Sequence, residues 1–153
     1  MANIRIGSHP SHDYEVVEKI TEAKQLTWND SGKLFFCEQG GAYVVNLPKL
    51  SEEIAGWQAK FILSKIGSSN LDILVYGATG AGTPAGTADL DKLVFLEMTH
   101  AGLVAPASPV DGLRFPASST ASDVGTIVDI YTDGTKWHMV GVGDTITALG
   151  TVN

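Results

Sequence analysis

The chain has 153 residues and a formal net charge of −7, and 44% of its residues are hydrophobic while only 18% are charged. This length suits one domain that buries most of its apolar surface without a disulfide or metal to staple it. Ten scattered Lys and Arg residues neither neutralise a phosphate backbone nor hold an anionic bilayer, which argues against nucleic-acid and membrane partners.

A single cysteine, Cys37, excludes an internal disulfide and a multi-thiolate zinc site. Its place in the apolar run 34–37 predicts a small hydrophobic strand residue. The first residues have no signal-peptide core, and no apolar run approaches the ~18 residues that cross a bilayer. We therefore expect a soluble protein made in a cytoplasm, and the low charge favours assembly with other subunits.

Residues 1–24 are expected to form an N-terminal arm and entry segment, followed by a single β-rich domain over residues 25–153. Pro10 and its small polar neighbours interrupt any strand ladder. Residues 14–24 fit either a helical turn or a strand. The arm is a candidate contact for a partner through four residues, Ile4, Ile6, His9 and His12.

Three strands are predicted between residues 25 and 48, because turn clusters at 29–32 and 40–41 separate them and Pro48 closes the last one. We expect them to form an antiparallel meander. Residues 49–56 predict a short helical turn, with Ser51 as a possible N-cap.

Further strands are predicted over residues 57–66, 71–76 and 93–98, and the alternation after residue 144 permits a last short one. Two segments rich in small residues, 77–88 and 101–122, are predicted to be long loops. Within the second, Leu113 and Phe115 are expected to act as local anchors. Loops of this length are usually functional or covered by a partner.

Residues 126–142 give the clearest local signal, a hairpin around Asp133 and Gly134. A two-residue type I′ turn would pair Ile130 with Trp137 and place Asp129 opposite His138. This register gives one face that is apolar from end to end, and we expect it to reach the core through Val128, Ile130, Trp137 and Met139.

Taken together, the eight to ten predicted strands and the lack of βαβ spacing predict an all-β fold. The expected form is an antiparallel β-sandwich or barrel-like domain with long Gly/Ala/Pro-rich loops and an N-terminal arm. We find no internal repeat of fixed period.

No catalytic, cofactor-binding or metal-binding residue is predicted. The run 73–82 imitates the strand and glycine turn of a dinucleotide site, but the residues that follow cannot hold the required helix. His9, His12 and Asp13 lack a scaffold and a fourth metal ligand. The acidic residues beside Gly or Ser are explained by turn chemistry. We expect the three tryptophans, Trp28, Trp57 and Trp137, to pack in the core rather than form a sugar-stacking platform.

Two stretches resemble small β-rich structural proteins of tailed bacteriophage particles. The first runs from Leu26 to Leu63 and contains Asp-Ser-Gly-Lys at 30–33 and Leu-Pro at 47–48. The second is the segment 125–137, with its Asp-Gly-Thr-Lys-Trp hairpin. Because both patterns consist of turn and core signals, the resemblance does not by itself fix a role.

The resemblance implies a virion protein, either a capsid decoration (cement) protein or a tail-fibre or receptor-binding module that binds carbohydrate. We favour decoration, because we expect the chain to be complete in itself and it has no shaft-forming segment. The implied partner is the major capsid protein, the implied location is the outer capsid surface, and a homotrimer is implied for the assembled form. An enzymatic role is not expected.

Overall fold

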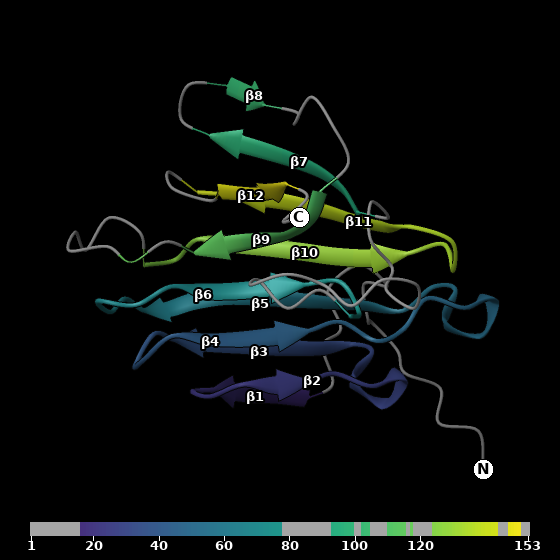
Figure 1. The fold of residues 1–153 in the computed structure, drawn as a ribbon, viewed down its shortest axis with the longest axis horizontal. Coiled ribbons are helices and arrows are strands. Elements are labelled where there is room, and N and C mark those ends of the chain that lie inside the picture. The colour runs from purple at the N-terminus through teal and green to yellow at the C-terminus, as the bar shows by residue number, and fades with distance from the viewer. Residues whose placement is uncertain are drawn as a thin grey trace, which may run out of the picture.

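The computed structural model of the protein describes residues 16–77, 93–99, 102–104, 110–115, 117, 124–143 and 147–150. These residues form twelve strands and two short 3₁₀ helices (Figure 1). The strands are β1 (Val16–Ile20), β2 (Lys24–Gln25), β3 (Lys33–Glu38), β4 (Tyr43–Asn46), β5 (Gln58–Lys65), β6 (Leu71–Leu74), β7 (Leu93–Thr99), β8 (Gly102–Val104), β9 (Val110–Phe115), β10 (Ile127–Thr132), β11 (Trp137–Val142) and β12 (Thr147–Gly150). The 3₁₀ helices are η1 (Trp28–Asp30) and η2 (Glu52–Ile54).

The strands lie in two layers. Figure 1 shows β2, β4, β6 and β9 in front of β1, β3, β5 and β10. The Tyr43 hydroxyl, on β4, donates toward backbone carbonyls of the other layer, at 3.1 Å from Ile20 O and 2.9 Å from Glu38 O. Because the described residues form strands and two 3₁₀ helices but no α-helix, the all-β expectation is confirmed for them.

The pairing within each layer is mixed, and the predicted antiparallel meander between residues 25 and 48 is wrong. Strands β1, β3 and β5 pair in parallel, and so do β2, β4 and β6. From β1 to β6 the chain changes layer after each strand, so β3 and β4 are not neighbours in a sheet. Parallel strands need a long connection, and here that connection contains a strand of the opposite layer.

Antiparallel pairing dominates the other half of the molecule. Strand β10 pairs antiparallel with β5 and β11, and β9 does so with β6 and β12, whereas β11 and β7 are parallel. One pair between β7 and β9, Leu93 with Val110, joins the two layers into a continuous hydrogen-bonded path. That path begins at β1 and ends at β2, which lie together at one end of the molecule (Figure 1).

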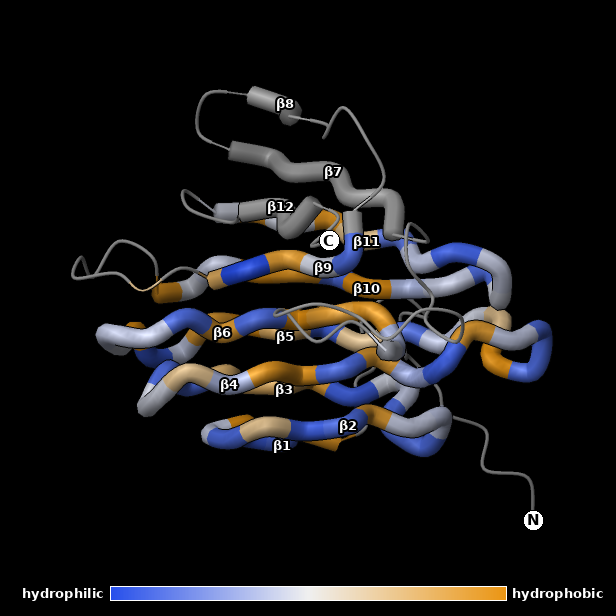
Figure 2. The backbone as a smooth tube through the Cα atoms, in the orientation of Figure 1, coloured by the Kyte–Doolittle hydropathy of each residue, from blue (hydrophilic) through white to orange (hydrophobic). Residues whose placement is uncertain are grey.

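Alternating side chains build the core between the layers. On β3, Phe35 and Cys37 are fully buried, while their neighbours Phe36 and Glu38 are partly exposed. The Phe35 ring stacks on Phe61 of β5, with the ring centroids 5.0 Å apart. Hydrophobic stretches recur along β4, β6 and β10 in Figure 2. The alternation on β3 has the period of two that is expected for a strand with one face in a core.

The segment predicted as a loop over residues 101–122 contains two strands, β8 and β9. Leu113 and Phe115 on β9 are 0% and 1% exposed, so the expected anchors belong to the central core. The sequence did not predict β9 because this strand contains a glycine, Gly112, where it packs against β6. A Cβ on Gly112 would lie 2.5 Å from the Ile73 carbonyl oxygen. Of the other predicted loop, 77–88, residues 78–88 lie outside the described residues.

The predicted hairpin forms, but its register differs by two residues. Thr132 pairs with Trp137, and Ile130 pairs with Met139. The loop therefore has four residues, 133–136. The Asp133 carboxylate closes it by accepting hydrogen bonds from the backbone N–H groups of Thr135 and Lys136, each at 2.8 Å. A shift of two preserves the faces, so the hairpin-core residues Val128, Ile130, Trp137 and Met139 are all buried as predicted.

Candidate functional site

One of the three tryptophans lies on the surface. Trp57 and Trp137 are 3% and 0% exposed, as expected for core residues, but Trp28 is 70% exposed. The expectation of a buried Trp28 is wrong, because this residue opens the 3₁₀ turn η1 instead of lying in a strand. Single exposed apolar residues are ordinary on protein surfaces, so whether Trp28 marks a binding surface depends on what lies beside it.

Two hollows adjoin Trp28. The larger is an open groove of about 460 Å³, whose lining includes Leu26, Trp28, Pro48, Lys49, Ile54 and Tyr76. The smaller, of about 180 Å³, is bounded by Trp28, Ile54 and Trp57 among others. We call the exposed indole and this larger groove the Trp28 surface. It combines aromatic and aliphatic area with a polar rim formed by Gln25 and Lys49.

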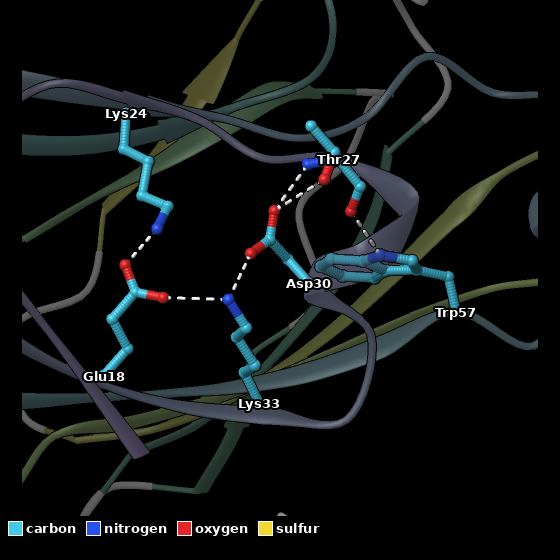
Figure 3. Close-up of polar contacts among 6 residues, drawn as sticks. All are labelled: Glu18, Lys24, Thr27, Asp30, Lys33 and Trp57. Atoms are coloured by element: carbon cyan, nitrogen blue, oxygen red, sulfur yellow. Dashed lines mark hydrogen bonds and ion pairs between the residues drawn. The ribbon is translucent and has the colours of Figure 1, made fainter. Parts of the chain in front are cut away.

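The turn that carries Trp28 is fixed by the Asp30 carboxylate. Asp30 Oδ2 accepts hydrogen bonds from the backbone N–H of Thr27 at 2.7 Å and from the Thr27 hydroxyl at 2.9 Å (Figure 3). These bonds bracket Trp28 on both sides in sequence. The arrangement resembles an N-terminal helix cap, in which a side-chain oxygen satisfies backbone donors that the helix leaves free.

A chain of ion pairs extends from Asp30 to strand β1. The Lys33 ammonium lies 2.6 Å from Asp30 Oδ1 and 2.9 Å from Glu18 Oε2, and Lys24 contacts the other Glu18 oxygen (Figure 3). Burial by itself would raise the pKa of Glu18 and of Asp30, but the hydrogen bonds from the lysines, and from Thr27 to Asp30, outweigh it and lower both pKa values. The same contacts raise the pKa of Lys33.

A buried tryptophan supports the turn from below. Trp57 Nε1 donates to the Thr27 carbonyl oxygen at 3.0 Å. The Trp57 ring also meets the Trp137 ring edge to face, at 5.2 Å between centroids and an angle of 87°, a favoured geometry for aromatic pairs. Trp57 therefore contacts both the hairpin core, through Trp137, and the exposed turn, through Thr27.

The sequence carried a signal for this turn. Thr27 and Asp30 have the three-residue spacing of a capping motif, which places Trp28 at the first position of a helical turn. The pattern of alternating apolar residues instead grouped Trp28 with the strand before it.

The other predicted site residues do not join this surface. Asp133 and Gly134 form the hairpin loop, where hydrogen bonds from Thr135 and Lys136 lower the pKa of Asp133 well below its ordinary value. Gly134 has φ +91°, which favours glycine. His138 stacks on Tyr131 and lies 3.5 Å from Asp133, whereas it was expected beside Asp129. The arm residues Ile4, Ile6, His9 and His12 lie outside the described residues.

Cys37, the single cysteine of the chain, lies buried in strand β3. Burial raises the pKa of the Cys37 thiol to about 12, which keeps it in the unreactive thiol form. Among the residues that the structure describes, no cluster of three or more His, Cys, Asp or Glu side chains is arranged to hold a metal. Nor does any helix in those ranges have the length and hydropathy to span a membrane.

Comparisons with protein-family models, with curated proteins and with solved structures found no match to this chain.

Proposed function

We propose that this chain is a non-enzymatic structural protein of a bacteriophage particle that binds the outer surface of the assembled capsid and stabilises it. The observation that carries the proposal is the Trp28 surface, an exposed indole held on a rigid turn of a β-stack. The partner is the major capsid protein. In this proposal the two layers, which include strand β1 and the first residue of β2 from the segment 1–24, act as a sandwich-like platform, and the arm residues Ile4, Ile6, His9 and His12 provide a second contact.

The exposed tryptophan suits a protein interface. Tryptophan is one of the residue types enriched among the few residues that dominate binding energy, and such residues lie in well-packed pockets of the interface. Because the Trp28 turn is already fixed by Asp30 and Trp57, little conformational entropy is lost when it docks.

The two stretches that resemble phage structural proteins support the proposal further. They are far apart in the sequence, yet the first ends on β5 and the second contains β10, and these strands pair in antiparallel register, with Phe61 beside Val128. The two resembling segments are therefore neighbours in one sheet. The residues that carry the resemblance lie in turns and in the core.

The proposed mechanism is mass action. A protein that binds the assembled shell but not its free subunits stabilises the shell by its binding free energy. Repetition over many sites multiplies this effect. A symmetric homotrimer would engage several shell subunits at once.

The test uses shells that lack the protein. Purified chain at saturation should raise the disassembly temperature of such shells, and Trp28→Ala should weaken the binding by about 2 kcal/mol or more, roughly 30-fold. Tyr131→Ala is the matched control, because Tyr131 is another exposed aromatic residue, at 46%, on the outer face of the hairpin. No temperature shift at saturation would overturn the proposal.

The second candidate is a carbohydrate-binding module of a tail fibre or receptor-binding apparatus. The specific observation that favours it is the groove, which sets Trp28 and Tyr76 beside the polar side chains of Gln25 and Lys49. Aromatic faces with nearby polar groups can hold the apolar face of a sugar ring while fixing its hydroxyls. Glycan-array binding by wild type that Trp28→Ala abolishes would favour this function over decoration.

A further inference from the structure

We infer that Asp30 is a positioning residue for Trp28, and that the ion pairs through Lys33 to Glu18 make the placement of Trp28 depend on strand β1. The consequence for binding rests on the proposed function. The placement itself does not, and it is measurable on the isolated protein.

The position of Asp30 requires a carboxylate. Its side chain is only 9% exposed and is approached by the Thr27 N–H, the Thr27 hydroxyl and the Lys33 ammonium. The amide and the ammonium can only donate hydrogen bonds. An asparagine would therefore turn its own N–H₂ group toward a donor in either orientation of its amide, and a nearly buried donor would lose its acceptor.

Lys33 connects this carboxylate to a second one on another strand. Lys33 opens β3, and Glu18 lies at the centre of β1, so the ammonium bridges the two strands and the turn (Figure 3). Its side chain is 21% exposed and that of Glu18 is 30% exposed, which leaves these pairs only partly screened by water.

Strand β1 is the first strand of the hydrogen-bonded path, and within the described residues it pairs with β3 alone. End strands of sheets open more readily than central ones. When β1 is docked, Glu18 orients Lys33 toward Asp30. When β1 separates from β3, Lys33 loses one of its two carboxylates. Separation of β1 from β3 therefore affects the placement of Trp28 through two successive ion pairs, Glu18 with Lys33 and Lys33 with Asp30.

The chain offers a matched control. Lys19 and Glu38 form another ion pair between β1 and β3, at 2.6 Å. Lys19 is 60% exposed in its side chain, and neither residue contacts the Trp28 turn in the contacts found for the described part of the chain. Glu38→Gln removes a pair between the same two strands without touching the network of Glu18, Lys33 and Asp30.

The experiment is ¹⁹F NMR of full-length protein labelled with 5-fluorotryptophan, which gives one resonance for each of the three tryptophans; Trp28→Phe assigns the resonance of Trp28. In Asp30→Asn we expect the Trp28 resonance to move toward its position in the unfolded protein, while that of Trp57, which donates to Thr27, moves less and that of Trp137 stays in place. Glu18→Gln should produce a smaller shift in the same direction, and Glu38→Gln none.

An unmoved Trp28 resonance in Asp30→Asn would overturn the inference. If Asp30→Asn collapses all three resonances, Glu18→Gln decides alone: movement of Trp28 beyond that in Glu38→Gln supports the inference, and equal behaviour of the two overturns it. Binding to shells should be about fivefold weaker in Asp30→Asn, because loss of one cap costs about 1 kcal/mol of local stability and binding must then supply that free energy to order the turn. If wild type does not bind shells, the proposed function fails while the resonance shifts still test the placement of Trp28.

Discussion

Trp28 and Asp30 are two positions apart in the sequence, yet one is 70% exposed and the other 6%. The reason is the 3₁₀ turn, which directs the Asp30 carboxylate inward to Thr27 and Lys33 and leaves the indole outside. The residue types alone suggested the reverse, since tryptophan usually packs in cores and aspartate faces water. Only the three-residue spacing of Thr27 and Asp30, which is typical of a helix cap, distinguishes the two cases.

The network at this turn gives the stability a defined response to acid. Asp30 and Glu18 have pKa values below their ordinary values of 3.8 and 4.5. A lowered pKa means that the unfolded chain binds protons first as the pH falls. The stabilisation is therefore complete above pH 4.5 and is lost progressively as the pH drops through the lowered values.

We predict that the free energy of unfolding, measured by urea denaturation, falls below about pH 4.5, and that Asp30→Asn makes this fall shallower. The Asp133 carboxylate contributes to the fall in both proteins because its pKa is lowered as well. The comparison therefore concerns the difference between the two curves. Parallel curves would show that Asp30 carries no such linkage.

A close backbone approach gives a second prediction at the scale of single residues. A Cβ on Gly67 would lie 2.0 Å from the Gln39 carbonyl oxygen, while one on Gly40 would meet nothing within 4 Å. Gly67→Ala should cost about 1–3 kcal/mol of unfolding free energy, the usual cost of overpacking. Gly40→Ala should stay within about 0.5 kcal/mol of wild type. Equal effects would mean that Gly67 and Gln39 are not in contact.

At the scale of elements, the sequence identified strands better than their partners. Most predicted strands form, and the two faces of the hairpin are correct, because alternation reports which side chains point inward. Alternation does not report whether a neighbour is parallel or antiparallel, and so the meander between residues 25 and 48 was wrong. The hairpin register was off by two residues because the Asp133 and Thr132 side chains stabilise a longer loop.

Strand β9, like β8, lies in a segment that the sequence predicted as a loop, and its pairing with β6 can be tested. Arg114 and Asp72 lie opposite each other and form two hydrogen bonds, at 2.7 and 2.8 Å. Arg114→Ala leaves the nearly buried Asp72 carboxylate without this partner and should cost about 2–3 kcal/mol. The double variant Asp72→Ala/Arg114→Ala should recover part of that loss.

The control for this pair is Lys60→Ala, because Lys60 pairs with Asp129 on the exposed face, where Asp129 is 44% exposed. Exposed ion pairs contribute little, so this variant should change the unfolding free energy by less than about 1 kcal/mol. If the losses of unfolding free energy in Asp72→Ala and Arg114→Ala simply add in the double variant, the two residues do not interact, and the register of β6 and β9 is contradicted.

At the scale of the whole molecule, the end strands β1 and β2 lie at one end of the two layers, and the Trp28 turn connects β2 to β3. Lys24 on β2 and Lys33 on β3 both reach Glu18 on β1, so the network spans both layers. This arrangement fits a structural protein that presents one rigid surface to a large partner. The proposed trimer and the role of the arm stay predictions.

The most direct test of the account is an electron cryomicroscopy reconstruction of shells incubated with the purified chain. We predict added density on the outer capsid surface at regular lattice positions, with the Trp28 turn at the contact with the major capsid protein. Shells without added density at saturating protein, or density that attaches through a face remote from Trp28, would contradict it.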